Sequence, residues 1–248
     1  MGYQEEYVRA GRSLKRALKR SSLRRPLRAV KRRADELALV FASRQDRRHA
    51  LSGPRQAWRV KRDYQISFLR DAGLQPQHRL LDLGCGTLRG GIPIINVLDD
   101  GHYWGVNARE QALTAARAEL VDAGLEHKRP RLIHGSDFDL LHLGVKFDVI
   151  WAFSVLPHLD DAVLGGALRC VKEHLANDGR FFATVHLGSS KGGGSWDEFP
   201  DLRRPLDFYE KEAARADLEV LDLGALSELK HPPNVVNAFH HMLEMRAA

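Results

Sequence analysis

Cysteine is scarce in this 248-residue chain: it has only Cys85 and Cys170. Neither has metal-ligand spacing, and the dense cysteine pattern of a small disulfide-bonded secreted domain is missing. No apolar run approaches the roughly 18 residues that a membrane span needs. The N-terminus also lacks the charged, apolar and small-residue order of a secretory signal. These absences predict two free thiols and a cytoplasmic protein without a transmembrane segment.

Acidic residues are missing from a long stretch near the N-terminus. From Arg9 to Arg33 there are 12 Lys or Arg and no Asp or Glu. Residues 1–50 carry a net charge of +10, so the rest of the chain carries −4 of the overall +6. Leucines recur there at near-helical spacing, and Ser21-Ser22 followed by Pro26 predicts a break. We expect two short, basic, amphipathic helices.

Three interpretations of the basic stretch remain open. Residues 9–33 can bind an anionic surface, either a membrane or a nucleic acid. The apolar stripe can instead pack on the remainder of the protein, or the stretch can be a solvated tail. Aromatic side chains, on which single-stranded RNA bases would stack, are missing between residues 9 and 33.

What the chain does have is a glycine turn after an apolar strand. Residues 79–83 predict a buried strand, which breaks into Gly84 and Gly86. Such a turn lets a cofactor lie against bare backbone near a helix N-terminus. Further strands are predicted at residues 102–107, 131–138 and 147–153, and the first of these ends in Asn107, where a ribose-binding group is expected.

These segments resemble the class I methyltransferases that use S-adenosylmethionine (SAM). Residues 82–87 match the first motif of that family, residues 136–138 its adenine-binding corner and residues 147–150 its fourth motif. The resemblance covers roughly residues 60–246. It implies an α/β fold with a seven-stranded, mostly parallel, doubly wound sheet whose last strand is antiparallel. The expected domains are a basic helical extension over residues 1–55 and a methyltransferase domain over residues 56–248.

The chain departs from the family at two positions of the cofactor site. Leu88 stands where the family usually has a third glycine, and Asn107 stands where it usually has Asp or Glu. Arg62 and Arg89 are candidates to bind the carboxylate of SAM, because a guanidinium can hold that group with two hydrogen bonds. The other cofactor-binding residues that the resemblance implies are Asp82, Gly84, Cys85, Gly86, Asn107, Asp137, Phe138 and Phe153.

The remaining pattern alternates between helices and strands, as this fold requires. Helices are expected over residues 58–69, 109–123, 160–175 and 206–216. The last three strands are expected over residues 180–186, 218–224 and 237–246, with the final strand antiparallel to its neighbours.

Two histidines follow the fourth and fifth predicted strands, where the reacting groups of such a fold meet. An imidazole can take the proton that a hydroxyl acceptor must lose during methyl transfer. His158 and His186 are therefore the candidate catalytic residues. A purely structural role, in packing or hydrogen bonding, is the alternative for both.

Two insertions are candidates for acceptor binding. Residues 188–200 are rich in glycine and contain Trp196 and Phe199, whereas residues 228–234 contain His231. Asp197 and Glu198, together with His186, are candidates to hold a divalent cation such as Mg²⁺.

The sequence therefore predicts a SAM-dependent O-methyltransferase that acts on a hydroxyl of a small polar acceptor, with a saccharide favoured. Two alternatives stay open. One is an RNA methyltransferase that uses the basic N-terminal arm, and the other is a SAM-binding scaffold without chemistry, suggested by Leu88 and Asn107.

The basic stretch gives the first testable prediction. If residues 1–50 only bind an anionic surface, deleting them removes salt-dependent association with anionic vesicles or RNA and leaves SAM affinity intact. Co-sedimentation at low and high salt measures the first effect, and calorimetry measures the second. Equal binding of the intact protein at both salt concentrations, or unfolding of the truncated chain, contradicts this interpretation.

Overall fold

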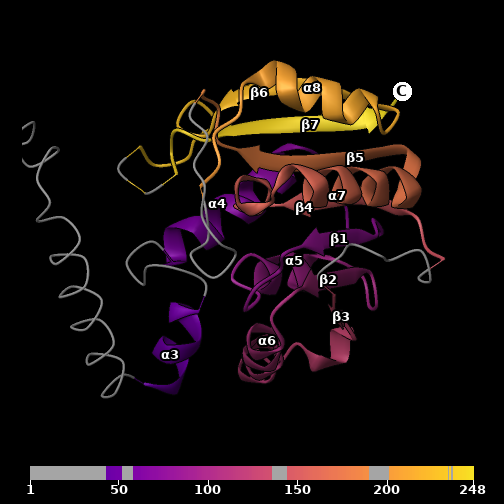
Figure 1. The fold of residues 1–248 in the computed structure, drawn as a ribbon. Coiled ribbons are helices and arrows are strands. Elements are labelled where there is room, and N and C mark those ends of the chain that lie inside the picture. Colours follow the sequence, from indigo (N-terminus) through magenta and orange to yellow (C-terminus); the bar gives the residue numbers. More distant parts are fainter. Residues whose placement is uncertain (1–42, 52–57, 136–143, 190–200, 234, 236) are drawn as a thin grey trace, which may run out of the picture. The chain divides into compact units, whose positions relative to one another are not determined.

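The computed structural model describes residues 43–51, 58–135, 144–189, 201–233, 235 and 237–248 (Figure 1). The chain forms two compact units, Met1–Arg47 and Arg48–Ala248, so the predicted boundary at residues 55/56 stays a prediction. The basic stretch 9–33 lies outside the described residues. So do the predicted site residues Asp137, Phe138, Trp196, Asp197, Glu198 and Phe199.

The larger unit is built on a seven-stranded sheet with the order β3-β2-β1-β4-β5-β7-β6. Strands β1 to β5 pair in parallel, whereas β7 lies antiparallel between β5 and β6. The predicted α/β fold with an antiparallel last strand is thus confirmed. The strands are β1 Leu80–Leu83, β2 Tyr103–Asn107, β3 Arg131–His134, β4 Phe147–Ala152, β5 Leu175–Val185, β6 Leu218–Ala225 and β7 His241–Ala247.

Helices cover both faces of this sheet, and each face has its own hydrophobic core (Figure 1). Apolar side chains along β4 alternate between the two cores: Ile150 belongs to one, and Val149 and Trp151 belong to the other. Helices α4 Trp58–Asp71, α5 Gly91–Val97 and α6 Glu110–Asp122 pack on one face, and α7 Asp161–His174 and α8 Leu206–Ala214 pack on the other.

Two strands, β5 and β7, begin several residues from their predicted starts, whereas β1 and β2 begin one residue later than predicted. β5 starts at Leu175, because Phe147 already pairs with that residue before the register shifts. β7 starts at His241 and not at residue 237, because Asn237 adopts a left-handed φ of 78° and accepts a hydrogen bond from the His240 amide. The turn therefore extends the connection after β6 and delays the last strand.

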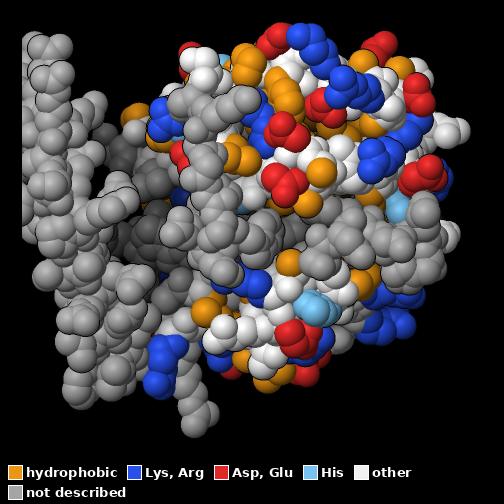
Figure 2. Space-filling view, viewed as in Figure 1, with side chains coloured by type: hydrophobic (Ala, Val, Ile, Leu, Met, Phe, Trp, Pro, Cys, Tyr) orange, Lys and Arg blue, Asp and Glu red, His pale blue; other side chains and the backbone are white. Residues whose placement is uncertain are grey.

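The charged residues of the larger unit are mixed in sign. Figure 2 shows Lys, Arg, Asp and Glu side chains interspersed over the face that carries α7 and α8. On α6, Glu119 and Asp122 form ion pairs with Arg48, a residue of α3 Arg44–Ala50. No helix within the described ranges is long and apolar enough to cross a membrane.

Helix α4 docks on the glycine turn through one buried side chain. The Gln65 amide donates to the Lys61 carbonyl oxygen at 3.0 Å, and its oxygen accepts from Trp151 Nε1 at 3.1 Å. A Cβ atom built on Gly90 would lie 2.3 Å from Gln65 Oε1. Glycine at position 90 therefore lets α4 lie directly against the turn that follows β1.

This contact predicts opposite effects for two Gly→Ala substitutions. Gly90→Ala is expected to lower the free energy of unfolding by about 2–4 kcal/mol, because the Gln65 carboxamide loses its two buried hydrogen bonds. Gly165→Ala is the matched control, since its Cβ would meet Arg169 at an ordinary 3.5 Å on α7. That substitution is expected to raise stability by about 0.5–1 kcal/mol. Denaturant unfolding measures both; equal stability of the two variants contradicts the role of Gly90.

Candidate functional site

The carboxyl end of β1 carries a buried charge pair. Asp82 Oδ2 accepts a hydrogen bond from Tyr103 Oη at 2.6 Å, and Arg89 lies close enough to attract the carboxylate. Burial raises the pKa of Asp82 to about 7, although Tyr103 and Arg89 both act in the opposite direction. Burial also lowers the pKa of Arg89 to about 10. An amino-acid ligand with one ammonium and one carboxylate group would complement both residues.

The glycine turn after β1 is braced on β2. The amides of Gly84 and Cys85 both donate to the Val106 carbonyl oxygen, at 2.8 and 3.0 Å. Gly84 has a φ of 78°, and a Cβ atom there would lie 2.5 Å from Val155. These amides are thus occupied within the fold, and the turn presents the exposed backbone of Gly84 to a ligand.

The departure at Leu88 lies in the same turn. Leu88 adopts a φ of 60° and is fully buried. That left-handed conformation costs little for glycine and more for a residue with a Cβ atom. Leu88 therefore holds a conformation that favours glycine, and its side chain fills the core beside Gly91.

Asn107 is the last residue of β2, and its side-chain oxygen already accepts a hydrogen bond. Its Oδ1 atom accepts from the Arg109 amide at 2.9 Å, an Asx turn that begins α6. The carboxamide NH₂ is then the group that Asn107 can offer a ligand. A ribose hydroxyl would accept a hydrogen bond from this NH₂ group. The same hydroxyl would instead donate a hydrogen bond to the carboxylate that is usual at this position.

Helix α4 contributes a cation that the sequence analysis missed. Lys61 is only 5% exposed. Burial, together with the positive charge of Arg89, lowers the pKa of Lys61 to about 8. The predicted Arg62 instead forms an ion pair with Asp63 at 2.8 Å and lies over the Trp58 ring. Lys61 is therefore a buried α4 cation that senses the charge of Arg89, and a cofactor role for Arg62 stays a prediction.

His231 and Phe153 pack together around Tyr64. The His231 ring lies edge-on to Tyr64 at 4.6 Å between centroids, and Phe153 lies 5.9 Å from the same ring. Tyr64 Oη and His231 Nε2 are buried without a hydrogen bond in the described part of the chain. Phe153 directly follows β4, so this aromatic group lies next to the carboxyl edge of the sheet.

The second predicted acceptor insertion lines a cavity of about 630 Å³. The cavity lies between α4 and the β6–β7 side of the sheet, and Leu229, Lys230 and Pro232 form part of its wall. Phe68 and Phe182 make its floor apolar, whereas Arg180 and Glu244 add charge. This cavity lies next to His231, and its lining residues do not include the turn after β1.

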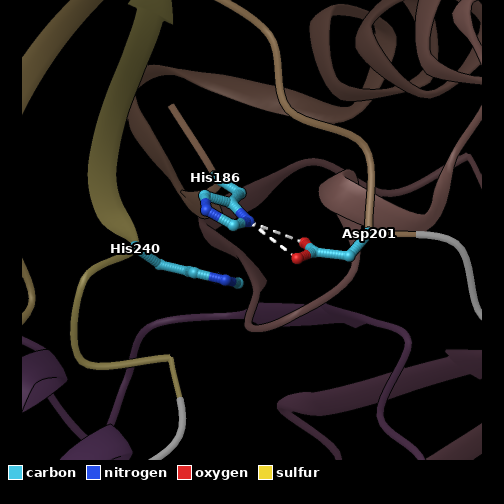
Figure 3. Close-up of side chains that lie close together, drawn as sticks. All are labelled: His186, Asp201 and His240. Atoms are coloured by element: carbon cyan, nitrogen blue, oxygen red, sulfur yellow. Dashed lines mark hydrogen bonds and ion pairs between the residues drawn. The ribbon is translucent and has the colours of Figure 1, made fainter. Parts of the chain in front are cut away.

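His186 is held by a carboxylate that the sequence analysis missed. His186 Nδ1 lies 2.8 and 2.9 Å from the two carboxylate oxygens of Asp201 (Figure 3). Residues 201–204 form a strap that carries Asp201, and backbone hydrogen bonds hold this strap in place. The Arg204 amide donates to the His186 carbonyl oxygen, and the Leu202 amide donates to that of Pro157. Asp201 therefore reaches His186 because residues 201–204 run beside the end of β5.

A second histidine, His240, stacks on His186 with centroids 4.9 Å apart. The pairing of Val185 with His241 explains this contact, because the next residues in the same register are His186 and His240. Burial, with the neighbouring charge of His186, lowers the pKa of His240 to about 3. His158, at the end of the 3₁₀ helix Leu156–His158, acts electrostatically on the same ring.

The structure thus brings together most of the described candidates at the carboxyl edge of β1, β4 and β5. Asp82, Arg89 and the glycine turn lie at one end of this edge, and His158 and His186 lie at the other. The residues that the sequence analysis missed are Lys61, Asp201 and His240. A signal for His240 existed, since an antiparallel strand after residue 237 had to pair with the strand ending near His186.

Comparison with protein families gives one match, to a methyltransferase domain over residues 81–181. These residues run from β1 into β5 and include the glycine turn, Asn107 and His158. No curated protein matches the chain.

Solved structures with the same fold share little sequence with this chain. The glycopeptide N-methyltransferase MtfA is 16% identical with a TM-score of 0.59, covering 75% of this chain and 90% of its own. A SAM-dependent methyltransferase from Clostridium acetobutylicum is 15% identical with a TM-score of 0.59, covering 87% and 99%. The SAM-bound magnesium protoporphyrin IX methyltransferase ChlM from Synechocystis is 14% identical with a TM-score of 0.56, covering 76% and 78%. The fold is thus that of SAM-dependent methyltransferases.

The raised pKa of Asp82 predicts how ligand affinity changes with pH. The ammonium group of S-adenosylhomocysteine favours the ionised carboxylate, so its affinity should rise with pH through 7 and level off near pH 8. We expect roughly tenfold weaker binding at pH 6 than at pH 8. Asp82→Asn should bind weakly and lose this pH dependence, whereas Glu244→Gln, at a buried carboxylate on β7, should keep it. Calorimetry measures the affinities, and an unchanged profile in Asp82→Asn contradicts the assignment.

Proposed function

We propose that this chain, which has the fold of the SAM-dependent methyltransferases and matches a methyltransferase domain over residues 81–181, transfers the methyl group of SAM to a hydroxyl of a small polar acceptor, with a saccharide favoured. The fold leaves the acceptor open. Its structural neighbours include an N-methyltransferase and a porphyrin methyltransferase. The argument for a hydroxyl therefore comes from the residues at the carboxyl edge of the sheet.

The carboxylate-held imidazole of His186 is the observation that carries this proposal. A hydroxyl must lose its proton when its oxygen takes the methyl group, and an oriented histidine accelerates that step by roughly 10²–10⁴-fold. The Asp201 carboxylate engages Nδ1 of the His186 ring, so Nε2 is the ring nitrogen left to take a proton from an acceptor. His158 lies on the same edge, so two imidazoles lie where β4 and β5 end.

The reaction itself is an in-line displacement. The acceptor oxygen attacks the methyl carbon, the carbon–sulfur bond breaks, and its electron pair stays on sulfur as S-adenosylhomocysteine forms. The acceptor's proton goes to an imidazole. Because this chemistry depends mainly on positioning, the glycine turn with Asp82 and Arg89 serves to hold the cofactor while the histidines face the acceptor.

Phe239 supports a saccharide as the acceptor. Its ring is 55% exposed and lies 4.6 Å from the His186 ring between centroids. An exposed aromatic face beside a polar group suits a sugar, whose C–H face can stack while its hydroxyls form hydrogen bonds. Trp196 and Phe199 remain predicted acceptor-binding residues outside the described part of the chain.

Label transfer tests the proposal. The protein is incubated with SAM labelled at the methyl group and with separate oligosaccharide, phenol and RNA fractions. We expect label in the oligosaccharide fraction, bound through an ether that resists mild alkali. Label in RNA favours the RNA methyltransferase, and SAM binding without transfer to any fraction favours the scaffold protein.

The histidines are tested with the acceptor that takes up label. His186→Ala is expected to lower kcat at least 10²-fold while the affinity for S-adenosylhomocysteine stays within about twofold. His241→Ala is the matched control, because His241 also pairs with a carboxylate, Asp222 at 2.9 Å, but starts β7 one residue away. If His186→Ala and His158→Ala both keep more than a third of the activity, general-base catalysis by either residue is wrong.

A further inference from the structure

His186, Asp201 and His240 form a cluster with the composition of a metal site. One coordinating atom from each residue lies within 4.8 Å of those of the other two (Figure 3). The three come from separate segments: the end of β5, the strap before Arg204 and the residue before β7. The pairing of Val185 with His241 and of Leu187 with Arg204 brings the three segments together, so the strand pairing of the sheet sets their positions.

His240 has no other evident function in the fold. Its ring is 3% exposed, and its Nδ1 atom is buried without a hydrogen bond in the described part of the chain. A buried polar group without a partner destabilises the fold. Figure 3 shows the ring reaching from the start of β7 toward the Asp201 carboxylate. A cation between the three residues would give this ring a ligand and explain its polar burial.

We propose that His186, Asp201 and His240 bind Zn²⁺, with the fourth coordination position open to the acceptor hydroxyl. Two imidazole nitrogens and one carboxylate oxygen suit Zn²⁺, whereas Mg²⁺ prefers oxygen ligands and water. Three protein ligands and one open position are the usual arrangement of a catalytic zinc. This zinc site shares His186 with the predicted Mg²⁺ site, whose other candidates, Asp197 and Glu198, lie outside the described residues.

The ion would bind where the hydrogen bond between His186 and Asp201 now lies. A proton on His186 Nδ1 now bridges the two side chains at 2.8 Å. Zinc replaces that proton, which is released on binding. Ligand atoms around tetrahedral Zn²⁺ are about 3.3 Å apart. The three atoms lie within 4.8 Å of one another, so no separation has to close by more than about 1.5 Å, a change within reach of side-chain rotation.

Bound zinc would divide the roles of the two predicted catalytic histidines. His186 becomes a ligand, and His158 becomes the group that takes the acceptor's proton. The metal draws electron density from the coordinated hydroxyl and so eases loss of that proton. The oxygen then attacks the methyl carbon, the carbon–sulfur bond breaks toward sulfur, and the metal is neither oxidised nor reduced. This division of roles rests on the proposed hydroxyl acceptor, but zinc binding does not.

Metal binding is measured first, on the full chain without SAM. Chelator-stripped protein is titrated with Zn²⁺ by calorimetry and with Co²⁺ by visible absorption, where a four-coordinate ion gives intense bands. We expect one ion per chain. His240→Gln and Asp201→Asn should each weaken Zn²⁺ binding by at least about 100-fold and remove the Co²⁺ bands.

The matched controls are His241→Gln and Asp222→Asn, which alter the neighbouring His–Asp pair of β6 and β7. Both should bind Zn²⁺ like the unaltered protein. Asp201 has a side chain that is 44% exposed, so Asp201→Asn tests the site even if His240→Gln does not fold. Unaltered Zn²⁺ affinity in Asp201→Asn, equal losses in the control variants, or no binding of one ion per chain overturns the proposal.

The outcomes separate this inference from the proposed function. Stoichiometric zinc without methyl transfer to any hydroxyl supports the site and contradicts the proposed acceptor. Methyl transfer by stripped protein, undiminished by chelator and without bound zinc, supports the proposed function and overturns the zinc site. Restoration of activity to stripped protein by Zn²⁺, absent in Asp201→Asn, supports both.

Discussion

The antiparallel pairing of β5 with β7 is the interaction on which the acceptor side of the site depends. It places Val185 opposite His241 and so carries His186 and His240 into contact beyond the last paired residues. On its other side, the end of β5 pairs with the strap at Arg204, which delivers Asp201. Three polar side chains that are distant in sequence therefore meet because one short backbone segment is paired on both edges.

A different constraint governs the cofactor side, where charges are buried close to the glycine turn. Asp82, Arg89 and Lys61 share this region with one carboxylate for two cations. Burying a charge without its counterpart is costly, so such a set is most stable when a ligand supplies the missing negative charge. The amino-acid end of SAM carries both signs: its ammonium would complement Asp82, and its carboxylate would complement Arg89 and Lys61.

Much of the fold could be predicted from the sequence, because the parallel strands are near-continuous apolar runs and Gly84 and Gly86 mark the first turn. The positions of Asp82, Arg89 and His186 at the strand ends followed from the same pattern. Lys61 was missed because its neighbour Arg62 has the same charge, and only the packing of α4 decides which of the two is buried. Asp201 and His240 depend on non-local pairing, and His240 also on the turn at Asn237 that delays β7.

The register between β5 and β7 also sets where the length of this chain can change. An insertion between residues 227 and 237 enlarges a connection and leaves every strand pair as it is. An insertion within residues 240–247 would turn each following side chain to the opposite face of the sheet and bring Met242 and Leu243 out of their two separate cores. Redesign of acceptor selectivity thus has freedom in the loop after β6 and almost none from His240 onward.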